Sequence, residues 1–270
     1  MNERVTGAMR YSLELERPGM LHAAIVRSHT PHAVITAVGL PGGLPEGCVL
    51  LTPADVADCA PYGCLVPDTP VLATTARYAG DPVAAVAAPD PELAARIARG
   101  VELAWDDLPA VTDLEAALAG GAPLVHDVLE VAARPGAWAG MRPLAGTNVS
   151  HRSRLIWGRG EAGFDEADVV VEGEWTTASA QHAPMEPHAC LAEWHDGRLT
   201  VWTGTQTPFN VRRELAGTFR LADADVRIVS LPMGGSFGAK TFTRIEAIAA
   251  ALARRAGAPV KLVLSRDELF

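Results

Sequence analysis

The first third of the chain alternates between short apolar runs and a segment with helical character. Residues 20–26 read as a strand, and residues 82–88 read as a buried one because almost every position there is apolar. Asp90 predicts the cap of a helix with proline at its first position, and Gly100 predicts its end. Residues 101–105 then resume as a strand. The order of strand, helix and strand predicts a small α/β domain.

This pattern breaks down over residues 119–150. Glycine and proline occur there too often for a regular element: Gly120, Gly121, Pro123, Pro135, Gly136, Gly140, Pro143 and Gly146. Apolar side chains in the same stretch indicate that it packs on a surface: Leu124, Val125, Val128, Leu129 and Trp138. We therefore expect an extended connector between a first domain, residues 1–118, and a second domain, residues 151–270.

The second domain again shows strand patterns. Residues 168–175 have one, and residues 188–194 and 198–202 flank an Asp-Gly pair at positions 196 and 197. Such a pair favours a hairpin, because both residues tolerate the positive φ of a type I′ turn. Residues 226–231 form a further apolar stretch directly before a glycine-rich segment.

Two helices are expected between and after these strands. Asn210 is placed to cap the first, which runs to about residue 220. The second has apolar residues at positions i, i+3, i+4 and i+7: Ile245, Ile248, Ala249 and Leu252. Gly257 predicts its end, and residues 259–264 predict a last strand. The expected fold class is α+β.

Composition and charge exclude several functions. The chain has 270 residues, of which 49% are hydrophobic and 20% charged, as in a globular protein. A net charge of −9 argues against nucleic acid as a partner. No apolar run approaches the roughly 18 residues of a membrane span, and the first residues lack the apolar core of a signal peptide, so a cytoplasmic location is expected. The four cysteines have no CxxC spacing, which predicts unpaired thiols and no zinc or iron–sulfur ligand set: Cys48, Cys59, Cys64 and Cys190.

The candidate chemistry centres on the segment Met233-Gly-Gly-Ser-Phe-Gly-Ala-Lys240. A strand that runs into glycines brings backbone N–H groups close to a ligand, because no Cβ atoms intervene, and suits an anionic, oxygen-rich molecule. The same residues are also compatible with a P-loop in which alanine replaces the glycine before the lysine. A purely structural turn is a third interpretation.

Two further polar clusters lie upstream, namely Gln181-His-Ala-Pro-Met-Glu-Pro-His-Ala189 and Thr203-Gly-Thr-Gln-Thr-Pro208. With the glycine segment they resemble, in order and spacing, the molybdopterin-binding large subunit of the xanthine dehydrogenase, aldehyde oxidase and carbon monoxide dehydrogenase family. Segments of the first domain resemble that family's α/β hammerhead domain: Arg17-Pro-Gly-Met-Leu-His22, Tyr78-Ala-Gly-Asp-Pro-Val-Ala84 and Leu108-Pro-Ala-Val-Thr-Asp113. The resemblance covers nearly all of the chain and is weakest in the connector.

The resemblance implies cofactor-binding roles for five residues. Phe237 and Gly238 correspond to the family's phenylalanine and glycine at the molybdenum centre. Gly235 and Ser236 fall where the backbone meets the pterin. Gln206 corresponds to a glutamine that hydrogen-bonds near the metal's oxo ligand, a task suited to a neutral amide donor. No residue of this chain is implied as a metal ligand or as a catalytic group.

Other polar residues are expected to be structural. Glu186 lies in a segment that is mainly architectural in the family, and we expect it to bind backbone N–H groups; His182 is likewise not expected to be catalytic. His188 and His195 are expected at the surface or in packing, and Arg212 and Arg213 on a solvated helix face. Two positions depart from the family pattern. Thr241 stands where purine-oxidising members have glutamate, which disfavours a purine substrate, and Ser236 replaces a glycine.

The implied fold is a small hammerhead-like domain followed by an incomplete mixed α/β molybdopterin-binding domain. The implied function is that of a component of a molybdenum hydroxylase, which inserts water-derived oxygen into an aldehyde or heterocycle. The family's catalytic base, a glutamate, lies in a later part of a longer subunit. The implied partners are therefore the C-terminal half of the large subunit, an iron–sulfur subunit and an FAD subunit. An alternative is a non-catalytic remnant or assembly module that docks partner subunits.

Overall fold

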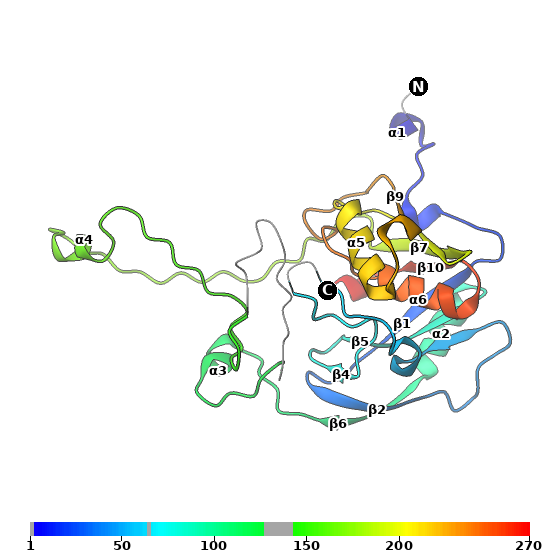
Figure 1. The fold of residues 1–270 in the computed structure, drawn as a ribbon, viewed down its shortest axis with the longest axis horizontal. Coiled ribbons are helices and arrows are strands. Elements are labelled where there is room, and N and C mark those ends of the chain that lie inside the picture. Colours follow the sequence, from blue (N-terminus) through cyan, green and yellow to red (C-terminus); the bar gives the residue numbers. More distant parts are fainter. Residues whose placement is uncertain (1–2, 64–65, 127–142) are drawn as a thin grey trace.

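A seven-stranded mixed sheet forms the centre of the computed structural model, which describes residues 3–63, 66–126 and 143–270 (Figure 1). The strand order is β3 (Val49–Leu51), β5 (Pro82–Ala88), β1 (Leu21–Arg27), β10 (Val260–Val263), β7 (Ala189–His195), β8 (Arg198–Thr203) and β9 (Val226–Ser230). A second, three-stranded sheet has the order β4 (Thr75–Ala76), β2 (Ala33–Gly39) and β6 (Glu102–Asp107).

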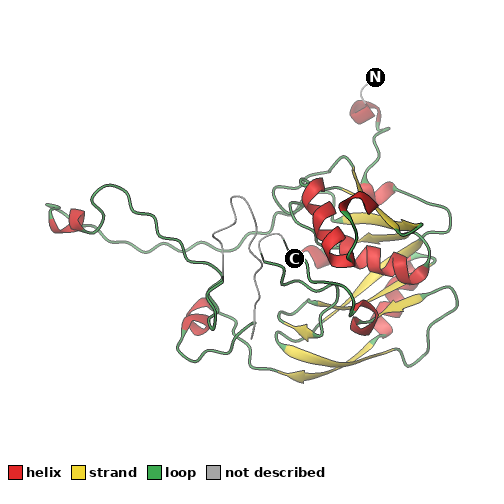
Figure 2. Ribbon diagram, viewed as in Figure 1, coloured by secondary structure: helices red, strands yellow, loops and turns green. Residues whose placement is uncertain are grey.

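Helices pack against strands of the central sheet, and others lie in the segments before and between the strands (Figure 2). The described residues include six α-helices: α1 (Glu3–Thr6), α2 (Pro91–Gly100), α3 (Leu114–Leu118), α4 (Ala162–Asp165), α5 (Pro208–Phe219) and α6 (Glu246–Ala256). They also include four short 3₁₀ turns: η1 (Ser12–Glu14), η2 (Pro53–Val56), η3 (Asp223–Asp225) and η4 (Asp267–Leu269). None of the described helices is long and apolar enough to cross a membrane.

The central sheet joins the beginning and the end of the chain. Strand β1 pairs in parallel with β10, so that Leu21 lies opposite Val260 and Ala23 opposite Leu262. The other side of β10 pairs antiparallel with β7. The two domains expected from the sequence therefore share one sheet, and the boundaries at residues 118 and 150 stay a prediction.

The core lies on both faces of this sheet. Side chains alternate between the two faces of a strand, and in β5 Ala85 and Ala87 pack into the cluster around α6, whereas Val86 and Ala88 pack with α2. This double cover explains why residues 82–88 are apolar throughout. Helix α6 is buried over eight consecutive residues from Glu246 to Ala253, more than the single apolar stripe predicts.

Local signals that cap and end elements are confirmed. The Asp90 carboxylate accepts the Leu93 N–H at 2.8 Å at the start of α2. Gly257 ends α6 in the left-handed region, with φ of 62°. In the β7–β8 hairpin, Asp196 and Gly197 have φ of 48° and 75°, as a type I′ turn requires.

Two predictions about elements are wrong. Helix α5 starts at Pro208 with Thr207 as its N-cap, and Asn210 lies inside its first turn, where it accepts a hydrogen bond from Arg213. Proline at the first position fixes the helical φ, and so it sets the start earlier in the chain. Residues 168–175 are extended and exposed, and form no strand. A strand needs a neighbour for its N–H and C=O groups, and none of the described residues supplies one.

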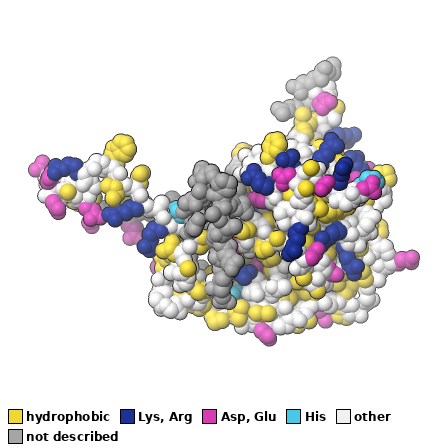
Figure 3. Space-filling model, in the orientation of Figure 1, with side chains coloured by type: hydrophobic (Ala, Val, Ile, Leu, Met, Phe, Trp, Pro, Cys, Tyr) yellow, Lys and Arg dark blue, Asp and Glu magenta, His cyan; other side chains and the backbone are white. Residues whose placement is uncertain are grey.

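The unpaired residues 168–175 belong to a segment that we call the arm, residues 150–183. The arm extends away from the sheets as two long stretches with α4 at its tip (Figure 1). Large apolar side chains on it are almost fully exposed, including Leu155 and Trp157 at 91% each and Trp175 at 86% (Figure 3).

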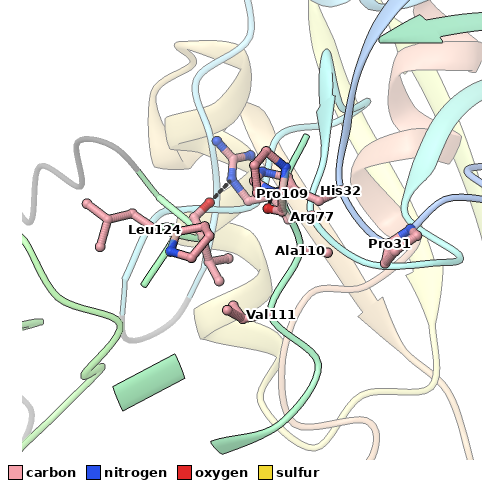
Figure 4. A pocket seen from close by; sticks show the side chains of 9 residues that line it. Pro31, His32, Arg77, Pro109, Ala110, Val111 and Leu124 are labelled. Atoms are coloured by element: carbon pink, nitrogen blue, oxygen red, sulfur yellow. Dashed lines mark hydrogen bonds between the residues drawn. The ribbon is translucent and has the colours of Figure 1, made fainter. Parts of the chain in front are cut away.

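The described parts of the connector rest on the first half of the chain. The side-chain amide of Asn148 links backbone groups of three residues. Its oxygen accepts the Val125 N–H, and its NH₂ group donates to the carbonyl oxygens of Ala117 and Pro123. Leu124 and Val125 line a pocket, and the Val125 carbonyl oxygen accepts a hydrogen bond from Arg77 at 3.0 Å (Figure 4). The predicted packing is therefore confirmed for these two side chains. Three other side chains of the connector were also expected to pack, and they lie outside the described residues: Val128, Leu129 and Trp138. Cys64 lies outside the described residues as well.

Candidate functional site

The three polar clusters meet where three neighbouring strands of the central sheet begin or end. In the register Cys190 lies opposite Thr203, and Thr203 lies opposite Ser230, so the start of β7 and the ends of β8 and β9 are neighbours. Hydrogen bonds then join the clusters. The Glu186 N–H donates to the Gly234 carbonyl oxygen at 3.0 Å, and the Gln206 N–H donates to the Lys240 carbonyl oxygen at 2.9 Å.

The glycine segment owes its shape to residues with positive φ. Gly235 has φ of 103° and Gly238 of 98°, values that residues with a side chain rarely adopt. Gly234 is required for a different reason, because a Cβ there would lie 2.7 Å from the Cβ of Glu186. Phe237 also has a positive φ, 54°, and its side chain is 75% exposed. Its left-handed conformation costs about 1–2 kcal/mol, which the surrounding loop must offset.

Four successive backbone N–H groups of this segment, in residues 235–238, have no hydrogen-bond acceptor among the described residues. None of them donates a hydrogen bond within the part of the chain that the structure describes, whereas the flanking N–H groups of Gly234, Ala239 and Lys240 all do. A run of N–H groups in a tight, partly left-handed loop forms a concave site for anionic oxygen atoms.

A buried ion pair supports the segment from beneath. The Glu186 Oε2 atom lies 2.8 Å from Lys240 Nζ and also accepts the Gly234 N–H at 2.8 Å. Both side chains of the pair are buried, with 2% and 4% of their surface exposed. One carboxylate thus holds both ends of the loop, which confirms the structural role expected for Glu186. The geometry argues against the P-loop interpretation, in which the lysine would reach out to phosphates.

Gln206 lies at the rim of the segment and is exposed. Its Oε1 atom accepts hydrogen bonds from Ser236 Oγ at 2.5 Å and Thr241 Oγ1 at 3.0 Å. The structure thus brings Gln206 together with the residues of the glycine segment, as the sequence predicts. The hydroxyl of Thr241 as a partner of Gln206 was not predicted.

Threonine hydroxyl groups next to Gln206 are a contribution that sequence reasoning missed. Thr205 Oγ1 donates to the Lys240 carbonyl oxygen at 3.3 Å, and Thr207 Oγ1 donates to the Thr241 carbonyl oxygen. The available signal was the alternation of threonine with other residues over positions 203–207, which places several hydroxyls beside the loop.

The histidines fall in different places. His188 is half-buried and its Nε2 atom lies 3.0 Å from the Ala239 carbonyl oxygen, so it packs beneath the loop as expected. His195 is exposed at the hairpin. The His182 ring lies beside Gly238, since a Cβ built on that glycine would be 3.5 Å from His182 Nε2. Arg212 and Arg213 lie on α5 and contact Asp223 and Asn210.

Burial of His188 should make the fold sensitive to acid. Burial lowers the pKa of its imidazole below the ordinary value, so the unfolded chain binds more protons as the pH falls through about 6.5. The stabilising contribution is full above that pH and is lost below it. We expect the free energy of unfolding to fall between pH 7.5 and 5, and His188→Gln to flatten this slope. Urea titrations at both pH values measure it, with the exposed His195→Gln as control.

A slope should remain in His188→Gln, because burial also lowers the pKa of His22 and of His126. An unchanged slope in His188→Gln would show that His188 does not carry the acid sensitivity.

No group of three histidine, cysteine, aspartate or glutamate side chains close enough to hold a metal ion exists among the residues that the structure describes. The cysteines described are free thiols: Cys48, Cys59 and Cys190. The site offers hydrogen-bond donors, namely the backbone N–H groups of residues 235–238 and the side-chain amide of Gln206.

Comparisons with known proteins agree with this geometry. The family model "Molybdopterin cofactor-binding domain" matches residues 144–270, and the model "Aldehyde oxidase and xanthine dehydrogenase, a/b hammerhead domain" matches residues 6–109. The expected α+β class, a hammerhead domain followed by part of a molybdopterin-binding domain, is thereby confirmed.

Individual relatives are similar over almost the whole chain. A probable xanthine dehydrogenase component of Bacillus subtilis is 34% identical over 98% of this chain and 34% of that protein. The "Xanthine dehydrogenase molybdenum-binding subunit" of Escherichia coli O157:H7 is 31% identical over 99% of this chain and 35% of that protein. Among solved structures, quinoline 2-oxidoreductase from Pseudomonas putida 86 superposes with a TM-score of 0.83 and 27% identity over 99% of this chain and 34% of that one.

The chain thus spans about a third of the length of these three relatives. Its two family matches, its fold and its glycine segment agree: this chain belongs to the molybdopterin-binding large subunits of the xanthine dehydrogenase, aldehyde oxidase and carbon monoxide dehydrogenase family, and corresponds to their N-terminal third.

Proposed function

We propose that this chain is a component of a molybdenum hydroxylase and contributes part of the site for the molybdopterin cofactor. The observation that carries the proposal is the row of N–H groups in residues 235–238, which have no acceptor among the described residues. Molybdopterin is rich in phosphate and other acceptor oxygens, and such a row of donors suits it. An anionic ligand gains most from this arrangement, because hydrogen bonds to charged acceptors are the stronger ones.

The roles of the individual residues follow from their positions. Gly235 and Ser236 would donate backbone hydrogen bonds to the pterin, and Phe237 and Gly238 would lie next to the metal end of the cofactor. Gln206 would donate from its side-chain amide. When bound, the cofactor supplies the redox chemistry, whereas the residues of this chain bind and orient it. The buried pair of Glu186 and Lys240 would keep the loop in shape without touching the ligand.

The proposed substrate is an aldehyde or a heterocycle. Thr241 is the residue that bears on this choice, since a glutamate at the same position contacts purines in the purine-oxidising members of the family. Here the Thr241 hydroxyl binds Gln206 instead. A threonine hydroxyl also carries no charge to match a purine ring, and so we disfavour a purine as substrate.

The proposed partners are the rest of the large subunit, an iron–sulfur subunit and an FAD subunit, in the cytoplasm. The arm supports the first of these. It exposes a strand-like segment, residues 168–175, in which Val171 is 88% exposed and Trp175 is 86% exposed. Free N–H and C=O groups beside large apolar side chains are features of a strand that pairs with another chain segment.

The arm should become protected when its partner is present. We expect trypsin to cut the isolated chain after Arg154 and Arg159, which are exposed and lie outside the helices and strands. Co-expression with the remainder of a family large subunit should slow these cuts at least tenfold. Mass spectrometry of the fragments over time measures the effect, and Arg96 in α2 serves as an internal control. Equal cleavage rates in a complex that has formed would exclude the arm as the docking segment.

The proposed function itself is tested by the metal content of that complex. The complex is purified from cells that make the molybdenum cofactor, and molybdenum is measured by mass spectrometry per mole of this chain. We expect near-stoichiometric metal in the complex and little in the isolated chain, which has only part of the site. A stable complex without molybdenum would contradict the proposal and favour the alternative, a non-catalytic assembly module.

A further inference from the structure

The amide of Gln206 is held by two side chains at positions where this sequence departs from its family. Ser236 replaces a glycine and Thr241 replaces the glutamate of purine-oxidising members. Both hydroxyl groups lie within hydrogen-bond distance of the same atom, Gln206 Oε1, at 2.5 Å and 3.0 Å. Neither contact could form with the residues that these two replace in the family pattern, since glycine has no side chain and a glutamate carboxylate has no proton to donate.

The hydrogen bonds around Ser236 run in one direction. The Lys240 backbone N–H can only donate, and it donates to Ser236 Oγ at 3.1 Å. The Ser236 hydroxyl proton is therefore available for Gln206. An O–H···O contact spans about 2.5–3.0 Å, whereas an N–H···O contact needs about 2.7–3.2 Å. The 2.5 Å contact therefore favours the amide oxygen over the nitrogen as the atom that faces Ser236.

Thr241 is fixed in the same way by its backbone. Its N–H donates to the Gly238 carbonyl oxygen at 3.3 Å, and its own carbonyl oxygen accepts from Thr207 Oγ1. With both backbone groups bound, the side chain is directed towards Gln206 Oε1. The backbone N–H of Gln206 is also bound, because it donates to the Lys240 carbonyl oxygen. The Nε2 group donates to no acceptor among the described residues.

We propose that Ser236 and Thr241 are positioning residues that hold the Gln206 amide in one orientation. The oxygen is turned into the loop, and the NH₂ group is presented outward as a donor to an acceptor oxygen of the bound ligand. The identity of that ligand rests on the proposed function, but the orientation of the amide does not. A free glutamine side chain would populate several rotamers and both amide orientations, and ordering it would weaken binding.

The chain offers a clean test, because it contains only two glutamines, Gln181 and Gln206. The full chain is labelled with ¹⁵N in the glutamine side chains, so that two NH₂ signals appear, and Gln206→Glu assigns them. We expect a higher order parameter for the Gln206 NH₂ group than for the exposed Gln181 NH₂ group, and a fall to the Gln181 level in the Ser236→Ala/Thr241→Val double variant. Thr241→Ser, which keeps the hydroxyl, should retain the rigidity that Thr241→Val loses.

Controls separate positioning from a general loss of structure. Ser230→Ala removes a nearby hydroxyl that binds the Thr205 carbonyl oxygen and does not contact Gln206, so the Gln206 signal should not change. The Gln181 signal should also be the same in all variants. The melting temperature should fall only where Ser236→Ala removes the acceptor of the Lys240 N–H, and the Ser236→Ala single variant measures that part alone. A mobile Gln206 in the unaltered chain, or a rigid one in the double variant, would overturn the proposal.

The same variants distinguish this proposal from the proposed function. If Gln206 is held rigidly as described but the assembled complex binds no molybdenum, the proposed function fails and the positioning stands. If the complex retains molybdenum while the Gln206 signal is mobile in the isolated chain and unaffected by both substitutions, the positioning fails alone.

Discussion

Gly238→Val is expected to abolish retention of the molybdenum cofactor in the complex with the remainder of a large subunit. Gly238 has φ of 98°, which a β-branched residue cannot adopt without strain. Space alone is not limiting, since the nearest atom to an added Cβ is His182 Nε2 at 3.5 Å. The backbone must therefore change its path, and the N–H groups of residues 235–238 would no longer converge on one ligand. Molybdenum per mole of chain should fall at least tenfold.

The matched control is Gly257→Val. Gly257 also has a positive φ, 62°, but lies at the end of α6, away from the loop, and a Cβ there meets nothing within 4 Å. It should lower the melting temperature by an amount similar to that of Gly238→Val and leave the molybdenum content unchanged. Full molybdenum occupancy in Gly238→Val would refute the assignment of this loop to the cofactor.

Lys240→Met should cause the largest loss of stability among single changes at the site. It leaves the Glu186 carboxylate buried without its cation, while Glu186 Oε1 already has no partner in the described structure. Removing one member of a buried pair costs about 3–5 kcal/mol. For a chain of this size, each kcal/mol lowers the melting temperature by about 2–4 °C. Calorimetry of the isolated chain measures both quantities.

A second substitution tests the physical cause. Glu186→Gln combined with Lys240→Met removes both charges and keeps an oxygen that can accept the Gly234 N–H, so it should recover part of the lost stability. Arg154→Met is the control for an exposed pair, because Arg154 and Glu161 are 70% and 87% exposed and the expected loss is below about 1 kcal/mol. A loss in Lys240→Met no larger than in Arg154→Met would mean that the buried pair does not support the loop.

Elements with local signals could be predicted from the sequence. Asp90 marks the start of α2, and the Asp-Gly pair marks the β7–β8 hairpin, because caps and turns depend on a few adjacent residues. The pairing of β1 with β10 could not be predicted in this way, since it joins opposite ends of the chain and has no local signal. The error at Asn210 has a similar cause, because Thr207 and Asn210 are both good caps and the choice depended on Pro208.

The candidate site shows the same division. The grouping of Gln206 with residues 235–238 was predictable, because their motifs adjoin strands that end at one edge of the sheet. The hydrogen-bond and ion-pair partners of the side chains within the site could not be predicted. A sequence does not state that Lys240 turns inward to Glu186, or that Ser236 and Thr241 bind one oxygen of Gln206. Those contacts depend on φ values in residues 235–238 that only the folded loop reveals.

The most direct test of the cofactor site is hydrogen exchange of the loop amides. The complex is measured by mass spectrometry with and without molybdopterin, and a peptide that covers residues 233–241 reports on the loop. The N–H groups of residues 235–238 donate to no acceptor among the described residues, so they should exchange quickly without the cofactor and slow by at least tenfold when it is bound. If the cofactor is bound and exchange in this peptide is unchanged, the proposed role of residues 235–238 in binding the cofactor is contradicted.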